Sequence, residues 1–193
     1  MNPQYLPETI SAKRLTLRKH RVEMAEVMFR HVDRDRARLG KFLPWVAWTR
    51  GIHDEREYIE MTQRQWEDYK MFDYGVFLNE GDVYVGNVGV HTIAWEHNRC
   101  ELGYWILAEY EGRGLISEAV KALETVLFSA GFFRIEIRCN GLNRRSGAVA
   151  ERCGYTLEAR LRKHVIENGQ RRDTLIYAKL KPDADDNGDV KTP

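Results

Sequence analysis

The residues with the clearest chemical potential form a short turn, in which Glu111, Gly112, Arg113 and Gly114 follow one another. The segment before this turn is apolar and aromatic and ends near Ala108. After it, apolar residues recur at helical spacing, at positions 115, 116, 119, 120, 123, 126 and 127. A glycine turn between a strand and a helix presents backbone N–H groups and the positive end of the helix dipole to an anion. The sequence therefore predicts a phosphate-bearing ligand here.

Two familiar phosphate-binding loops fit this turn poorly. A Walker loop requires Gly-Lys-Ser/Thr, and the chain contains no such triplet. A dinucleotide fingerprint, G-x-G-x-x-G, is nearly matched by Gly112, Gly114 and Ser117, but it normally opens a parallel βαβ unit. The segments before Gly112 are instead predicted to be an antiparallel meander, as described below, which weighs against a dinucleotide site.

The composition is that of an ordinary globular protein. The 193 residues are 43% apolar and 31% charged with a net charge of +1, which predicts one domain and no global attraction to nucleic acid. Cys100, Cys139 and Cys153 have no paired spacing and are expected to be reduced thiols. No apolar run approaches the roughly 20 residues of a membrane span, and no signal-peptide core is evident. We therefore expect a cytoplasmic protein without membrane association.

The elements that must position the turn begin after an N-terminal arm, predicted over residues 1–12. Leu15 and Leu17 alternate with polar neighbours, which predicts a half-buried strand over 14–20. Amphipathic helices are predicted over 22–39 and 53–71. Between them lies a segment dense in aromatic residues, 42–48, which Pro44 interrupts.

The second part of the chain is richer in strands. Strands are predicted over 74–79, 83–95 and 100–109, and another over 134–140 after the helix that ends near 130. A short helix over 143–155 precedes two strands, 155–166 and 171–181, joined at Asn168-Gly169, the strongest hairpin signal in the chain. Residues 182–193 contain four aspartates and are predicted to be a disordered tail. This order is mixed α/β and does not alternate strand and helix as a doubly wound fold does.

Several stretches, in this order and spacing, resemble motifs of the GNAT N-acetyltransferases. The turn Glu111-x-x-Gly114-x-Ile116 is similar to the family's acetyl-CoA motif Gln/Arg-x-x-Gly-x-Gly/Ala, with Glu111 and Ile116 as departures. The other similar stretches are the strand 101–106, the Asn143-x-x-Ser146 helix ending in Gly154-Tyr155, Glu158 with the strand after it, and the hairpin 168–177. Together with the aromatic segment 42–48, they resemble the RimJ/RimL-type branch, whose members acetylate ribosomal-protein N-termini and related amines.

The resemblance implies a GNAT fold over residues 13–181, with a central, mostly antiparallel, splayed sheet flanked by about four helices. It implies acetyl-CoA as co-substrate, and the histidines show no spacing that indicates a metal. The strand ending at Ile106 would splay from its neighbour, so that backbone groups at Ile106 and Ala108 pair with pantetheine and a backbone N–H supports the oxyanion. The residues implied to bind the coenzyme are Ile106, Leu107, Ala108, Glu111, Gly112, Arg113, Gly114, Leu115, Ile116, Ser117 and Asn143.

Glu101 is the candidate general base, acting through a water. Acetyl transfer from a thioester needs a neutral amine, a polarised carbonyl and a proton for the leaving thiolate. Strand alternation turns the Glu101 side chain to the face opposite that of Ile106. The alternative is a structural glutamate that pairs with Arg99 or Arg138.

Ser146 is the candidate acid for the thiolate. Its alternative role is that of an exposed first-turn residue in the helix that Asn143 caps. Two tyrosines, Tyr104 and Tyr110, are alternative acids. The residues expected to border the acceptor are Trp45 and Trp48, which could equally be core residues.

The predicted function is acetyl transfer from acetyl-CoA to a primary amine by direct attack, with a protein N-terminal α-amine as the preferred acceptor. An α-amine has a pKa of about 7.7–8.0 against about 10.4 for lysine, so far more of it is neutral at pH 7. Three alternatives remain open: acetylation of a small amine such as a polyamine, antibiotic or amino-acid derivative, a non-catalytic acyl-CoA-binding module, and a nucleotide-binding regulatory module. The oligomeric state also stays open, with a homodimer as one option.

Overall fold

The computed structural model describes residues 1–167 and 169–182, and within these ranges one sheet carries all the strands. Its order is β1-β2-β3-β4-β5-β6-β8-β7. The strands are β1 (Thr9–Ser11), β2 (Leu15–Lys19), β3 (Phe72–Leu78), β4 (Tyr84–Ala94), β5 (Arg99–Ile106), β6 (Arg134–Asn140), β7 (Thr156–Glu167) and β8 (Gln170–Leu180). The α-helices are α1 (Ala25–Arg34), α2 (Arg36–Leu39), α3 (Ile52–Glu67), α4 (Leu115–Ser129) and α5 (Arg144–Arg152).

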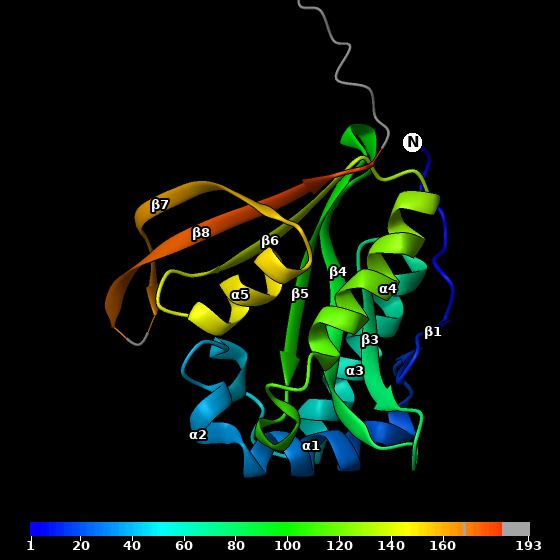
Figure 1. The fold of residues 1–193 in the computed structure, drawn as a ribbon. Helices are drawn as coiled ribbons and strands as arrows, with labels where there is room; N and C mark the ends of the chain where they lie inside the picture. The colour runs from blue at the N-terminus through cyan, green and yellow to red at the C-terminus, as the bar shows by residue number, and fades with distance from the viewer. Residues whose placement is uncertain (168, 183–193) are drawn as a thin grey trace, which may run out of the picture.

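The sheet is antiparallel at every junction except that between β5 and β6, which the crossover helix α4 connects (Figure 1). Parallel pairing of these two strands runs from Arg99 opposite Arg134 to Leu102 opposite Ile137, and then stops. Both strands continue past that point, β5 to Ile106 and β6 to Asn140, and they diverge. The predicted mixed α/β fold with a mostly antiparallel, splayed sheet is confirmed.

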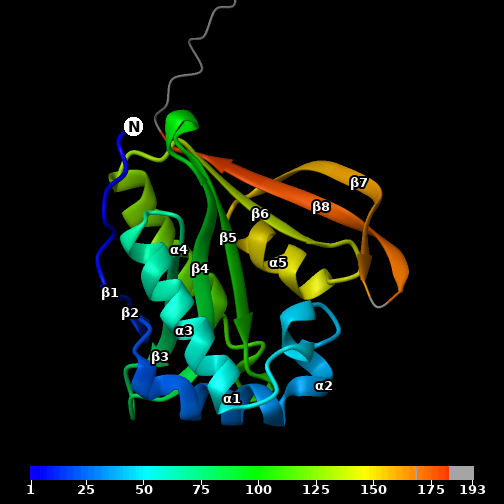
Figure 2. The ribbon, with the colours of Figure 1, turned by 180° about the vertical axis from the view of Figure 1, so that it is seen from behind.

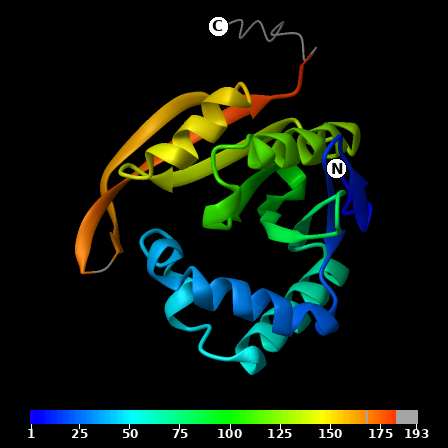
Figure 3. The same ribbon diagram turned by 60° about the horizontal axis from the view of Figure 1, so that its bottom comes forward.

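Helices cover the two faces of the sheet in different ways. On the face that we call the α4 face, α4 buries Val120, Leu123 and Leu127 against strand residues such as Leu102. On the other, the α3 face, α3 lies along the strands and α1 crosses near their lower ends (Figure 2). Viewed from the end of the molecule, the sheet separates α1, α2 and α3 from α4 and α5 (Figure 3).

The helix predicted over 22–39 is broken in the structure. A 3₁₀ turn at Val22–Met24 precedes α1, and the backbone of Asp35 then leaves the helical region with φ −106° and ψ 11° before α2 begins. The carboxylate of Asp35 bonds Arg38 and the Ala108 N–H, and these contacts fix a corner that a continuous helix would not allow. This break is why five α-helices lie within the described ranges where about four were expected.

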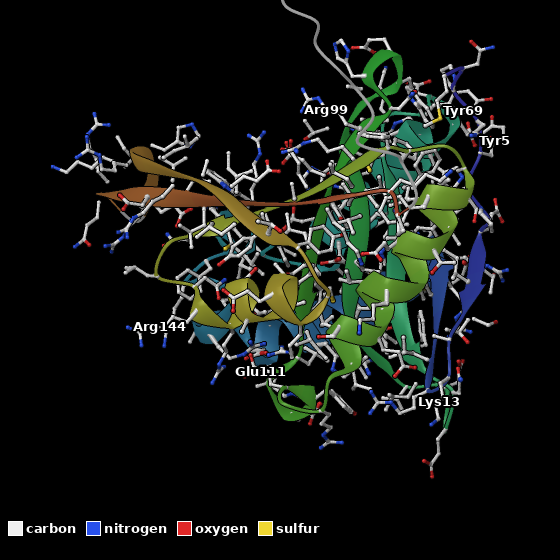
Figure 4. The ribbon with its side chains drawn as sticks, turned by 45° about the horizontal axis from the view of Figure 1, so that its top comes forward. Tyr5, Lys13, Tyr69, Arg99, Glu111 and Arg144 are labelled. Carbon is white, nitrogen blue, oxygen red and sulfur yellow. The ribbon has the colours of Figure 1, made fainter. Side chains whose placement is uncertain are left out.

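The N-terminal arm also contributes to the sheet. Residues 1–12 include the unpredicted strand β1, which pairs antiparallel with β2. The Met1 amino group donates to the Trp95 carbonyl at 2.8 Å, and the ring of Tyr5 lies 4.5 Å from that of Tyr69 (Figure 4). These contacts hold the arm along the edge of the molecule.

At the other end of the chain, β7 and β8 form the predicted antiparallel hairpin. Of the predicted turn, Asn168 lies outside the described residues, as do residues 183–193 of the predicted tail. In the part of the chain that the structure describes, no helix is both long and apolar enough to cross a membrane.

Candidate active site

The glycine turn has the geometry that an anion site requires. Gly112 and Gly114 have φ values of 72° and 73°, in the left-handed region that favours glycine. Gly114 is the N-cap residue of the fifteen-residue helix α4, so the free N–H groups of the first turn point into the space beside it. A Cβ on Gly112 would meet no atom within 4 Å, so this surface is open to a ligand. The turn predicted from the sequence is present, with its two glycines in the left-handed region before a helix N-terminus. Phosphate binding there stays a prediction.

Glu111, which departs from the Gln or Arg of the motif that this turn resembles, is held between two arginines. Arg38 Nη1 donates to its carboxylate at 2.6 Å, and Arg145 from α5 donates to the other oxygen. Figure 4 shows Glu111 below α5, beside the turn that precedes α4. Arg38 also pairs with Asp35, so two guanidinium groups balance two carboxylates beside the turn. The negative charge of Glu111 is therefore compensated where an anion would approach.

The splayed edge of β5 carries the two backbone groups predicted to meet pantetheine. The Leu107 N–H donates to the Val85 carbonyl at 2.9 Å, on the β4 side. The Ile106 carbonyl instead accepts from Arg38 Nη2 at 2.5 Å, and the Ala108 N–H donates to Asp35 at 3.0 Å. Both predicted groups therefore face the α1–α2 corner.

The Asp35 carboxylate is ionised in this contact. Burial by itself would raise its pKa, but Arg38 and the Ala108 N–H outweigh burial and hold the pKa below its usual range. The charged acceptor is therefore present at any pH near neutrality, and the corner stays in contact with the splayed edge.

The predicted acid Ser146 and its alternative Tyr104 lie together. Ser146 Oγ donates to Tyr104 Oη at 3.2 Å, and Tyr104 Oη donates to the Ser146 carbonyl at 2.9 Å. Burial raises the pKa of Tyr104 well above its ordinary value, so its hydroxyl keeps its proton. Asn143 Oδ1 accepts from the Ser146 N–H at 3.2 Å, the expected helix cap. The other alternative, Tyr110, lies elsewhere, beneath the Arg113 guanidinium.

Glu101 lies on the α3 face, opposite Ile106 in the alternation of β5, and is only 7% exposed. Arg138 Nε approaches its carboxylate to 3.3 Å, so one of the two foreseen ion-pair partners is present. The residue directly across from it on β4 is His91.

Reasoning from the sequence did not identify His91 as a candidate base. Its Nε2 stands 3.0 Å from the position that a Cβ of Gly103 would take, at the point where β5 parts from β6. Its Nδ1 bonds Thr92 Oγ1 at 2.9 Å. Burial lowers the pKa of His91 despite the nearby charge of Glu101, so the imidazole is neutral at pH 7 and can accept a proton. The predicted strands 83–95 and 100–109 follow each other closely, and pairing them as a hairpin would have placed His91 opposite Glu101.

A cavity of about 450 Å³ opens on the α3 face and reaches the splay. Its floor includes Asp73, Gly89 and Gly103, which are aligned across β3, β4 and β5 by the strand register. Of the two tryptophans expected to border the acceptor, Trp45 lines this cavity, whereas Trp48 is 72% exposed and does not. The other lining residues are Leu43, Thr49, Glu55, Tyr58, Met61, Met71, Asn87, Val90, His91, Tyr104 and Trp105.

A buried polar cluster stands at the β3 end of this cavity. Asp73 Oδ2 accepts from Tyr58 Oη at 2.7 Å and from Asn87 Nδ2 at 3.1 Å, and His20 Nε2 lies 2.9 Å from the same oxygen. Glu55 is 3% exposed, and burial followed by the charges of Asp73 and Asp54 raises its pKa to about 7. No pattern in the sequence marks these residues as a group.

The described residues contain no group of three or more His, Cys, Asp and Glu side chains that could hold a metal ion. The three cysteines are buried free thiols, and burial raises the pKa of each. They are therefore poor nucleophiles at neutral pH.

Comparison with known proteins identifies the class. Residues 14–156 match the family described as the acetyltransferase (GNAT) domain, and the chain belongs to this family. It is accordingly an acetyl-CoA-dependent N-acetyltransferase, as predicted.

The relatives and neighbours agree with the RimJ/RimL-type branch. YdaF of Bacillus subtilis, provisionally named a ribosomal N-acetyltransferase, is 30% identical over 169 residues, which are 86% of this chain and 91% of YdaF. The ribosomal-protein-serine acetyltransferase of Escherichia coli is 26% identical, over 79% of this chain and 85% of its own. A RimL structure with coenzyme A superposes with a TM-score of 0.86 at 24% identity, covering 90% of this chain and 98% of RimL. The microcin C7 self-immunity acetyltransferase MccE, solved with acetyl-CoA and AMP, has a TM-score of 0.83 at 27% identity, covering 87% and 93%.

Proposed function

We propose that this enzyme acetylates the N-terminal α-amine of a protein, with ribosomal proteins as the preferred acceptors. The observation that carries the proposal is the meeting of the α3-face cavity with the splayed strand edge at Gly103. An amine in the cavity can approach a thioester held at the splay from the side opposite α4. Two of the relatives described above are named for ribosomal acceptors, which supports this choice. A ribosomal acceptor would place the reaction in the cytoplasm.

For the coenzyme, the proposal assigns the pyrophosphate to the turn and to the first N–H groups of α4, from Glu111 to Ser117. Pantetheine is assigned to the Ile106 carbonyl and the Ala108 N–H, with Leu107 between them and Asn143, the N-cap residue of α5, as a further contact. Acetyl-CoA supplies the activated acetyl group as a thioester. Because Arg38 and Asp35 bond the same two backbone groups, they must release them when the coenzyme binds.

Two groups can accept the proton of the attacking amine. Glu101 is proposed to act through a water, because its carboxylate pairs with Arg138 and does not line the cavity. His91 lines the cavity directly, and its neutral imidazole can take the proton at Nε2 while Nδ1 stays bonded to Thr92. The two bases lie across one strand pair, so a proton can pass from one to the other through water.

Ser146 is proposed to give a proton to the departing thiolate. Its Oγ–H already donates to Tyr104 Oη, and Tyr104 remains protonated because burial raises its pKa. The pair therefore forms a short chain of hydroxyl groups beside the splay, in which either can be the final donor.

The acetyltransferase domain itself is proposed to span residues 13–181, with residues 1–12 as an arm that adds β1 to the sheet.

A small amine is the second candidate acceptor. The cavity volume of about 450 Å³ lies in the range of small-molecule sites, roughly 300–1,000 Å³, and supports this alternative. A thiol-release assay separates the two candidates. Peptides with the N-terminal sequences of ribosomal proteins, the same peptides with blocked N-termini, and small primary amines are each incubated with acetyl-CoA. Release only with free N-termini supports the proposal, whereas equal release with blocked lysine-containing peptides would contradict it.

A further inference from the structure

Glu55 is a buried acid without a partner. It projects from α3, is 3% exposed and lines the α3-face cavity. Within the described residues its side chain makes no hydrogen bond and no ion pair, and the charges that act on it, Asp73 and Asp54, are both negative. An ionised carboxylate in such a place is unfavourable unless a donor or a cation compensates it. The uncompensated side chain therefore points to a ligand.

Asp73 provides a second acidic group at the same end of the cavity. Its Oδ2 is used by Tyr58, Asn87 and His20, while its Oδ1 occupies the space that a Cβ of Gly89 would fill. The absence of a side chain at Gly89 leaves this oxygen over the cavity floor. The carboxylates of Glu55 on α3 and Asp73 on β3 thus face the same end of the cavity.

The strand register fixes the distance from the Glu55–Asp73 end of the cavity to Gly103, where the proposed reaction takes place. Asp73 pairs with Gly89, and Gly89 pairs with Gly103 at the splay. Two steps across neighbouring strands place the backbones of Asp73 and Gly103 about 10 Å apart. Neither glycine has a side chain, and the atoms nearest to the two vacant Cβ positions are polar, Asp73 Oδ1 at Gly89 and His91 Nε2 at Gly103. A slender chain that crosses the sheet here would therefore pass over two polar groups.

The walls complete a site for a cation. Trp45 and Trp105 pack with ring centroids 5.8 Å apart, and both line the cavity together with Tyr58. Aromatic faces attract ammonium and guanidinium groups. An anion would be repelled by Glu55 and Asp73, and a neutral apolar group would leave Glu55 uncompensated.

We propose that the Glu55–Asp73 end of the cavity binds a second cationic group of the acceptor while its primary amine is acetylated at Gly103. This rests on the proposed function for the position of the reacting amine. The shared chemistry is a slender acceptor with two cations, and it has two sources. One is a polypeptide whose first side chain is basic, and the other is a free aliphatic diamine.

The test compares acceptors that differ only in the second charge. For the peptide source, an N-terminal arginyl peptide is compared with its citrullyl counterpart, in which only the α-amine can react and the neutral side chain has nearly the same shape. For the small-molecule source, putrescine is compared with butylamine. The wild-type enzyme should favour the charged member of one pair by roughly ten- to a hundredfold in kcat/KM, the range for a hydrogen bond to a charged group. Glu55→Gln should reduce that ratio to near one.

Glu60→Gln is the matched control, because Glu60 lies on the exposed side of the same helix and the variant removes the same charge. It should keep the wild-type ratio. A wild-type ratio near one for both pairs, or an unchanged ratio in Glu55→Gln, would overturn the inference even if free N-termini are acetylated. A preference confined to putrescine would support the cation site and refute the peptide acceptor. If no acceptor turns over, calorimetry decides: putrescine must bind wild type and Glu60→Gln more tightly than Glu55→Gln.

Discussion

Residues at the corner between α1 and α2 bond the backbone groups that we assign to pantetheine. Removing these bonds by substitution tests that assignment. Asp35 accepts the Ala108 N–H at 3.0 Å, and Arg38 donates to the Ile106 carbonyl at 2.5 Å. A coenzyme that uses the same groups must first break these contacts. Asp35→Ala removes the acceptor of one contact and the ionic anchor that holds Arg38 at the other. Coenzyme A should therefore bind more tightly to this variant.

The magnitude follows from the contact that is lost. A hydrogen bond to a charged group contributes about 1.5–3 kcal/mol, and the low end applies because the Ala108 backbone is exposed. The coenzyme no longer has to break a contact of about 1.5 kcal/mol, so its Kd should fall about tenfold. The free energy of unfolding without coenzyme should fall by a similar amount, since the same contact stabilises the protein.

Titration calorimetry with coenzyme A measures the first quantity and urea denaturation the second. Asp33→Ala is the control, because Asp33 is more than half exposed on α1 and pairs with Arg36 at 3.0 Å, away from the splay. Its Kd for coenzyme A should equal that of the wild type. An unchanged or weaker Kd in Asp35→Ala, with a native circular dichroism spectrum, would show that the coenzyme does not compete for these groups.

Three other variants test separate parts of the site. Gly114→Val should abolish coenzyme A binding in calorimetry, because a branched residue is strained at φ 73° and its Cβ would stand where the phosphates approach; retained binding would refute the phosphate assignment. Glu101→Gln should lower kcat on the order of 100-fold, with a loss that shrinks as pH rises and more acceptor amine is neutral; a loss independent of pH would make Glu101 structural. Glu55→Gln should remove a pH dependence of the free energy of unfolding. Burial raises the pKa of Glu55 from 4.5 to about 7, so protonated Glu55 stabilises the wild-type fold fully below pH 4.5. About 3 kcal/mol of the wild-type free energy of unfolding is then lost as pH rises from 4.5 to 7. Denaturation at both pH values measures this, and equal changes in the two proteins would contradict it.

The parts of the fold that the sequence predicts are those whose signals are local. The apolar spacing after Gly114 is enough to predict α4, and Leu15 and Leu17 are enough to predict β2, because each pattern reports directly which face is buried. The break at Asp35 could not be predicted in this way. It depends on contacts to Arg38 and to Ala108, and the latter is 73 positions away in the chain. Helical periodicity on both sides of the break hides it.

The same distinction applies to the site. Gly112 and Gly114 are recognisable because their residue type reports a backbone conformation. Ser146 and Tyr104 were separate candidates in the sequence, and only the packing of α5 against β5 shows that they are hydrogen-bonded partners. The Glu55 carboxyl is the extreme case. On α3 it is one of several acidic residues, and its burial without a partner depends on strands that follow it in the chain.

The α1–α2 corner also connects the proposed coenzyme site to the proposed acceptor cavity. Arg36 on α2 donates to the carbonyls of Val46 and Thr49, the latter at 2.6 Å, and Leu39 packs against Val46. The segment that they hold carries Trp45, which lines the cavity. A coenzyme that displaces Arg38 from Ile106 would therefore act on the element that supports one wall of the proposed acceptor cavity. Because such coupling is reciprocal, coenzyme A should change the Kd of the acceptor by the same factor by which the acceptor changes the Kd of coenzyme A. Calorimetric titrations with the two ligands added in either order measure both factors. A factor of one would show that the two sites are independent.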